Sequence, residues 1–313
     1  EFRRVLFRSF MNKTAEFLVF GATGQQGGAV AFALRAQGRE VRAFVRDPHS
    51  EKAQALRAAG ITLAVGDLFD RASIEHAMEG IKGVFSVQTS SPRGEISDEQ
   101  EIIQGKAIAD SALATGVSHL VYSSSGAAGK GLTGMGHFDS KSEIENYVRS
   151  LPLSWTITRP ASFMEMLMLP GMGLNTGNFS FFMQRNQPMQ MITLDDLGRI
   201  NARILCHPQQ FAGKVLEISS QTLTGEDLER AFSNAAGFPV HYQRFPDALL
   251  TQNSFLRRLT ELVDNGIVAG IADIPALEKV FGEMMKLDQW LTGPGKHLFN
   301  AALNAPQTEI TLR

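Results

Sequence analysis

The sequence predicts an α/β protein built on a doubly wound parallel β-sheet. Short apolar runs alternate with amphipathic helical patterns from Glu16 onward, and most of the helical patterns end at a glycine. Parallel strands need a crossover between them, usually a helix, so this alternation predicts a parallel sheet with helices on both faces. Right-handed crossovers then produce the doubly wound topology.

The predicted strands are short runs rich in Val, Ile, Leu and Phe, such as "EFLVF" and "VRAFV". Such nearly continuous apolar runs are typical of parallel strands that are buried on both faces. The predicted strands span residues 16–20, 41–45, 61–65, 83–87, 119–123, 154–158 and 214–219.

The helices between these strands are predicted from apolar spacing and from their ends. Glycine is the preferred residue just after a helix, and Gly38, Gly60, Gly80 and Gly116 stand at such positions. The predicted helices span residues 25–37, 50–59, 71–79, 97–115 and 139–150.

The pattern changes after Pro160. Residues 161–191 hold seven of the twelve methionines and several glycines. This composition favours a mobile flap, although methionines also fill cores. Helices are expected over 194–206 and 224–237, with a short strand over 240–245 and a largely helical remainder.

The first ten residues, "EFRRVLFRSF", have no counterpart in the pattern that follows. They lack the uninterrupted apolar stretch of a signal peptide. We expect residues 1–10 to be a non-native leader and the native chain to begin at Met11. A genuine basic arm is the alternative.

Composition excludes several classes of protein. The net charge is −2 with a pI near 6.4, so direct nucleic-acid binding is not expected. Apolar runs stay shorter than the roughly 18 residues of a membrane span. The histidines show no zinc-type spacing, so no metal is expected. One cysteine excludes an internal disulfide and fits a reducing cytoplasm.

A glycine-rich turn follows the first predicted strand and opens the first predicted helix. In "FGATGQQGGAV" the glycines at 21, 24 and 27 allow a tight turn, a close approach of a pyrophosphate and close helix–strand packing. The N–H groups at the helix start favour phosphate. This context predicts a Rossmann dinucleotide site contacted by Gly21, Ala22, Thr23, Gly24, Gln25, Gln26 and Gly27.

The residue after the second strand distinguishes NADP from NAD. Arg46 stands there, and its guanidinium can bind the 2′-phosphate of NADP. Asp47 follows, and an acidic group at this edge can instead bind the ribose of NAD. The arginine favours NADP(H).

Further contacts are expected at the carboxyl ends of the third and fourth strands, where ligands bind in this fold. Asp67 and Leu68 are expected at the adenine edge, although Asp70 with Ser73 also indicates a helix cap there. Contacts with the ribose or the nicotinamide are expected from Gln88, Thr89 and Ser90; an ordinary polar loop is the alternative.

Together these segments resemble the short-chain dehydrogenase/reductase superfamily, and more closely its NmrA-like branch, which includes an NADPH sensor. The matching pieces are "FGATGQQGG", "VRAFVRDP", "GDLFD", "HFDSKSEIENYV", "ITLDDLG" and "LDQWL". The resemblance implies a cofactor part over about 11–160 and 192–222 and a small α-rich substrate or partner lobe over about 161–191 and 223–313, within a single domain. It also places Phe163, Met164, Glu165 and Met166 over the nicotinamide.

The resemblance implies a catalytic group from which one member is missing. In ordinary members of the superfamily a Tyr-x-x-x-Lys pair acts with an upstream serine: the tyrosine passes a proton, the lysine binds the nicotinamide ribose and the serine stabilises the oxyanion. Here Lys141 and Ser124 are present, but histidine occupies position 137.

Three hypotheses address this substitution. His137 replaces the tyrosine as the acid, since an ordinary histidine pKa of about 6.5 suits proton donation. Alternatively, the group only binds cofactor. In the third, "SKSE" is a capping box whose Ser140 starts the helix, so His137 lies outside it.

These hypotheses favour an NADP(H)-binding, redox-sensing regulatory protein that lacks the usual catalytic tyrosine. The alternative is an NADPH-dependent oxidoreductase of quinones or other carbonyls. The expected partners are NADPH and either a small-molecule substrate or a regulatory protein, and a homodimer is possible.

Overall fold

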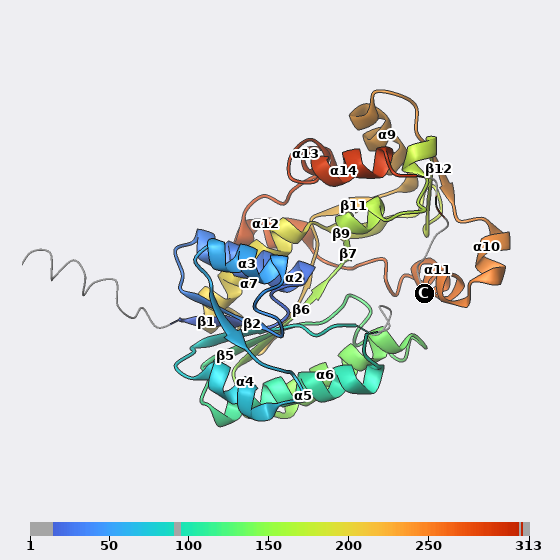
Figure 1. Ribbon diagram of the computed structural model, residues 1–313. Coiled ribbons are helices and arrows are strands. Elements are labelled where there is room, and N and C mark those ends of the chain that lie inside the picture. Colours follow the sequence, from blue (N-terminus) through green and yellow to red (C-terminus); the bar gives the residue numbers. More distant parts are fainter. Residues whose placement is uncertain (1–14, 91–94, 307, 309–313) are drawn as a thin grey trace, which may run out of the picture.

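A seven-stranded parallel sheet forms the centre of the computed structural model, which describes residues 15–90, 95–306 and 308 (Figure 1). The strand order is β10-β6-β5-β4-β1-β2-β3, and every neighbouring pair is parallel. This is the predicted doubly wound fold, which is therefore confirmed. The strands are β1 (Phe17–Val19), β2 (Val41–Val45), β3 (Thr62–Val65), β4 (Gly83–Ser86), β5 (His119–Ser123), β6 (Trp155–Pro160) and β10 (Lys214–Ile218).

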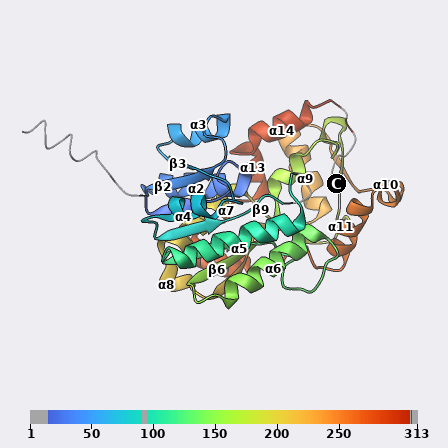
Figure 2. The same cartoon turned by 60° about the horizontal axis from the view of Figure 1, so that its bottom comes forward.

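Helices cover both faces of this sheet (Figures 1 and 2). Side chains alternate along β1: Phe17 and Val19 belong to one apolar cluster, while Leu18 and Phe20 belong to another. Such alternation needs a covered surface on each side. One face carries α2 (Gln25–Ala36), α3 (Glu51–Ala58) and α7 (Leu194–Cys206); the other carries α4 (Arg71–Met78), α5 (Asp98–Ala114) and α6 (Gly136–Ser150).

The strand order reverses direction between β1 and β4. From β1 the chain passes outward through β2 and β3, then returns to β4 on the other side. Loops at the carboxyl ends of β1 and β4 therefore diverge, and this divergence opens a crevice at that edge of the sheet.

The C-terminal residues add two small sheets and a group of helices. One sheet has the order β11-β9-β7 and the other pairs β12 with β8. Their strands are β7 (Ser162–Phe163), β8 (Asn178–Phe181), β9 (Met189–Ile192), β11 (Gln221–Leu223) and β12 (His241–Arg244). The helices are α8 (Pro208–Phe211), α9 (Gly225–Ala236), α10 (Asp247–Gln252), α11 (Ser254–Asp264), α12 (Ile274–Phe281), α13 (Leu287–Thr292) and α14 (Lys296–Leu303), with short 3₁₀ turns at Met164–Met168 and Leu174–Thr176.

The methionine-rich segment is core, so the expected mobile flap is wrong. Six of its seven methionines are buried, packed among phenylalanines from β8 and the C-terminal helices. An unbranched, adaptable side chain fills such an irregular interior well. The buried methionines are Met164, Met168, Met172, Met183, Met189 and Met191.

Two other expectations concern an N-terminal leader and the absence of membrane-spanning helices. The proposed leader, residues 1–10, lies outside the described residues. In the described part of the chain, the model contains no helix that combines the length and the apolar character needed to cross a membrane.

Helices α2 and α7 pack so closely that Gly198 is expected to tolerate no side chain. A Cβ at this position would lie 2.5 Å from the carbonyl oxygen of Ala29. Gly198→Ala should therefore force the helices apart and lower the free energy of unfolding by about 1–3 kcal/mol, as measured by urea denaturation.

Gly126→Ala is the matched control, since its Cβ would make an ordinary 3.4 Å contact with the oxygen of Pro160. Equal stability of the two variants would contradict the close packing.

Candidate functional site

The glycine turn between β1 and α2 has the predicted geometry. Gly21 has a φ of +65°, and its carbonyl oxygen accepts a hydrogen bond of 2.8 Å from the N–H of Gly24. A Cβ on Gly27 would lie 2.3 Å from the same oxygen. The first turn of α2 has neither a side-chain cap nor an acidic residue, so its N–H groups are free of side-chain partners and favour an anion.

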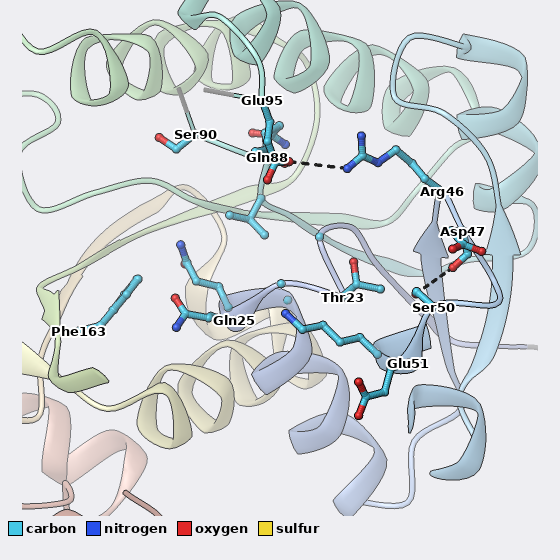
Figure 3. A pocket seen from close by; sticks show the side chains of 17 residues that line it. Thr23, Gln25, Arg46, Asp47, Ser50, Glu51, Gln88, Ser90, Glu95 and Phe163 are labelled. Atoms are coloured by element: carbon cyan, nitrogen blue, oxygen red, sulfur yellow. Dashed lines mark hydrogen bonds and ion pairs between the residues drawn. The ribbon is translucent and has the colours of Figure 1, made fainter. Parts of the chain in front are cut away.

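A cavity of about 690 Å³ lies along this turn (Figure 3). Arg46 and Asp47 lie at one end of it, Ser90 and Phe163 at the other, and Thr23 between them. An elongated polar cavity of this kind suits a dinucleotide. The predicted residues that line it are Gly21, Thr23, Gly24, Gln25, Gln26, Gly27, Arg46, Gln88, Thr89, Ser90 and Phe163.

Seven predicted cofactor contacts lie outside this lining, and two of them, Lys141 and Met166, line an adjoining cavity. Ala22 is buried, and Leu68 packs against one apolar face of the sheet. The Asp67 carboxylate accepts the N–H of Phe69, and Asp70 caps α4. In the C-terminal part, Met164 is in the core, and Glu165 Oε1 accepts the N–H of Leu194 at 3.1 Å. Burial raises the pKa of Glu165.

The end near Arg46 holds three further charged side chains that the sequence did not single out: Glu51, Lys52 and Glu95. The Arg46 guanidinium lies 3.8 Å from the Glu95 carboxylate, and both side chains are largely exposed. Asp47 Oδ1 accepts the N–H of His49, so this carboxylate serves the structure of its own loop. Arg46 and Lys52 are the cations at this end of the described lining.

A second cavity, of about 300 Å³, adjoins the first; we call it the apolar cavity. The two cavities share Gln26, Ser90 and Phe163. Most of its walls are apolar: Ala127, Phe138, Pro160, Ala161, Met166, Phe181, Phe182, Met189, Phe255, Leu259, Val263 and Val268. Its polar walls include the three predicted catalytic residues, Ser124, His137 and Lys141.

The histidine lies inside helix α6, which begins at Gly136 rather than Ser140. The capping-box hypothesis is therefore wrong: Ser140 is buried within the helix. His137 and Lys141 stand four residues apart, so they lie on the same face of the helix and enter the same cavity.

The surroundings of His137 lower its pKa well below the ordinary value of about 6.5. Its ring packs 4.0 Å from the Phe138 ring and 5.5 Å from the Phe255 ring, centre to centre. Burial, and then the charge of Lys141, lower its pKa to about 4. At neutral pH the imidazole is therefore uncharged, and it lacks the ordinary pKa of about 6.5 that the acid hypothesis assumed. The neutral ring still offers one N–H donor and one acceptor.

Lys141 forms an ion pair with Glu101 of α5, a residue that the sequence analysis missed. The Lys141 side chain is 9% exposed and that of Glu101 is fully buried. The other carboxylate oxygen of Glu101 accepts a 2.9 Å hydrogen bond from Ser140. Sequence could not reveal this pair because its members lie on different helices, far apart in the chain.

Several polar atoms around the two cavities have no hydrogen-bond partner among the described residues. They are Ser124 Oγ, Ser125 Oγ, Ser90 Oγ and Gln88 Oε1, all buried. Buried polar groups are normally paired, so these atoms are suited to contact a ligand. The described residues contain no cluster of three or more His, Cys, Asp or Glu that could hold a metal.

Lowering the pH from 7 to 5 is expected to destabilise the protein through two neutral histidines. His119, buried with its ring nitrogens 2.8 and 2.9 Å from Ser154 and Thr156, also has a pKa lowered to about 4 by burial. Both histidines resist protonation in the fold but gain protons when unfolded below about pH 6.5. Each therefore lowers the free energy of unfolding by up to about 2 kcal/mol over this range.

Urea denaturation at the two pH values measures this loss. His137→Phe should lose less stability than the wild type on acidification, while the exposed control His49→Gln should behave like the wild type. A wild-type pH dependence in His137→Phe would contradict the assignment.

Comparisons with known proteins find relatives that are similar in sequence and in fold. An oxidoreductase from Malbranchea aurantiaca that contains an NmrA-like domain, malD, is 31% identical over 251 residues, covering 72% of this chain and 74% of malD. NmrA, a negative transcriptional regulator solved with NAD, superposes with a TM-score of 0.75 at 22% identity, covering 92% of this chain and 98% of NmrA.

The NADPH-dependent quinone oxidoreductase QOR2 of Escherichia coli, solved with NADPH, superposes with a TM-score of 0.73 at 24% identity. The match covers 91% of this chain and all of QOR2. At such identities the structural likeness shows the fold alone. The model of the NmrA-like family, however, matches residues 13–300, nearly the whole sequence. The chain belongs to the NmrA-like family.

Proposed function

We propose that this protein is an NADPH-dependent oxidoreductase that reduces small, flat, apolar carbonyl compounds of the quinone type. One observation carries the proposal: the apolar cavity, with Ser124, His137 and Lys141 in its wall, opens onto the end of the glycine-turn cavity near Phe163. An apolar pocket with a few convergent polar groups is the usual form of a substrate site.

The residues of the first cavity fit NADP(H). The N–H groups of the glycine turn would bind the pyrophosphate, because a side chain at Gly27 is excluded and α2 starts uncapped. Arg46 and Lys52 would bind the 2′-phosphate. That NmrA was solved with NAD and with NADP, and QOR2 with NADPH, supports this assignment.

The opposite end of the same cavity would hold the nicotinamide. Ser90 and Phe163 would lie beside the nicotinamide, since they line both cavities. When bound, NADPH would supply a hydride to the neighbouring acceptor.

The side chains around the apolar cavity would stabilise the reduced oxygen. Ser124 has an unpartnered hydroxyl, neutral His137 offers an N–H, and Lys141, held by Glu101, offers further N–H donors. Donors directed at the oxygen on which charge develops lower the barrier to hydride transfer.

The missing tyrosine then restricts the substrates. Hydride transfer to a quinone produces a phenolate. The conjugate acid of this phenolate has a pKa of about 10, like that of tyrosine, so the phenolate can form and dissociate without receiving a proton from the protein. The alkoxide formed from an aldehyde is a far stronger base and needs a proton during the reaction. Since His137 is uncharged, the site favours quinones over simple aldehydes.

A redox-sensing regulator is the second candidate. The observation that favours it is that the chain has neither the tyrosine nor a charged histidine in the group around Lys141. Such a protein would bind NADPH without turnover and present its occupied form to a partner protein. That NmrA is a negative transcriptional regulator supports this candidate.

Oxidation of NADPH, followed by absorbance, separates the two candidates. We expect turnover with 2-methyl-1,4-naphthoquinone, and at least about 100-fold lower kcat/KM with benzaldehyde. Ser124→Ala should lower kcat/KM for the quinone by about tenfold, since it removes one donor to the oxygen. NADPH binding without turnover of any quinone would refute the oxidoreductase and support the regulator.

The charge at position 46 should determine the choice of cofactor. Arg46→Ala is expected to raise the Kd for NADPH by about 10–100-fold, because a charge-assisted contact with the 2′-phosphate is lost. The Kd for NADH should change by less than about threefold. Both are measured by fluorescence titration, with Arg57→Ala, an exposed arginine on α3, as the control. Equal losses for the two cofactors would sink the phosphate role.

A further inference from the structure

We propose that Glu101 is a specificity-determining residue: by neutralising Lys141 in the wall of the apolar cavity, it makes the site select uncharged acceptors. The inference rests on the proposed function, since it concerns the charge of the acceptor that this cavity binds.

Lys141 and Glu101 occupy different positions relative to the apolar cavity. Lys141 lines the cavity, whereas Glu101 lies behind it on α5, fully buried and outside the described lining. Both carboxylate oxygens are engaged, one by Lys141 and the other by Ser140. Glu101 therefore holds the ammonium group in place from behind, and the remaining two N–H donors of Lys141 are free for the cavity.

The charge that a ligand meets in the apolar cavity depends on Lys141 and its partner. Among the described residues that line the apolar cavity, Lys141 is the one with a charged side chain, because His137 is neutral at pH 7. Charges interact strongly in such water-poor surroundings. An anionic acceptor would lose its hydration and gain little, since Glu101 already neutralises Lys141. A cationic acceptor would meet no carboxylate in this wall.

Other contacts also join the two helices. Lys106 of α5 and Glu143 of α6 form a second ion pair between the same helices, 2.6 Å long and partly exposed. Gly105 of α5 also packs against Ile144 of α6. Burying a further ion pair costs desolvation and is often no more stabilising than apolar packing. A role in the cavity explains why this pair is buried here.

Ligand binding tests the inference without requiring turnover. The Kd values of 2-methyl-1,4-naphthoquinone and of 1,4-naphthoquinone-2-sulfonate are measured by calorimetry with NADP⁺ present. The wild type should prefer the uncharged quinone. Glu101→Gln leaves the charge of Lys141 unpaired, so the ratio of the two Kd values should shift by at least about tenfold toward the sulfonate.

Two control variants isolate the buried carboxylate. Glu143→Gln makes the same change of charge between the same helices at the surface, and should keep the wild-type ratio. Glu101→Asp keeps the charge and should also keep it. A wild-type ratio in folded Glu101→Gln, or an equal shift in Glu143→Gln, would overturn the proposal.

A second variant keeps the test decisive if Glu101→Gln fails to fold. Lys141→Met leaves Glu101 unpaired and should shift the ratio by at least about tenfold the other way, against the sulfonate. No shift there would equally overturn the proposal. Failure of both quinones to bind the wild type would instead refute the proposed function, whereas binding and turnover with unaltered ratios would refute this inference alone.

Discussion

The close approach of α2 to the end of β1 is the constraint on which the rest of the site depends. A Cβ on Gly27 would meet the carbonyl oxygens of both Gly21 and Phe20 at less than van der Waals distance, so the turn closes only with glycine there. This closure brings the uncapped start of α2 to the crevice where the strand order reverses. The helix N–H groups, the end of β2 with Arg46 and the end of β4 with Gln88 then face one cavity.

The chemistry depends on how that cavity meets the apolar one. Phe163 lies in β7, shortly after the end of β6 of the central sheet, and it lines both cavities. Helix α11 and the methionine-rich segment supply the opposite wall, with Phe255 and Met189. Enclosure by these apolar side chains keeps His137 uncharged. That same effect makes an apolar acceptor a better fit than a charged one, and it favours an enzyme over the regulator expected from the sequence.

Much of the fold could be predicted because its patterns are local. Buried strands and glycine-ended helices were recognised from neighbouring residues, and the predicted helix over 194–206 coincides with α7. The start of α6 was missed because Ser140, the expected cap, lies inside the helix, where its hydroxyl donates to Glu101 of another helix. The Asp139 carboxylate accepts hydrogen bonds from Thr133 and Gly134 in the loop that precedes the helix.

The apolar cavity could not be predicted because its walls come from distant segments. Ser124, Phe163, Phe182 and Phe255 meet only once the C-terminal part is folded against the sheet. The lowered pKa of His137 has the same origin, since burial is its largest cause. The buried partner of Lys141 also comes from another helix. Sequence motifs identified the polar residues, but their surroundings decide their charge.

A crystal structure with NADP⁺ and reduced 2-methyl-1,4-naphthoquinone tests the central claim most directly. The claim is that the nicotinamide lies beside Phe163, at the junction of the two cavities, and that the acceptor occupies the apolar one. We expect the naphthalene ring within the apolar cavity, with one oxygen within about 3.2 Å of Ser124 Oγ. A nicotinamide turned away from this junction, or a quinone bound elsewhere, would contradict it.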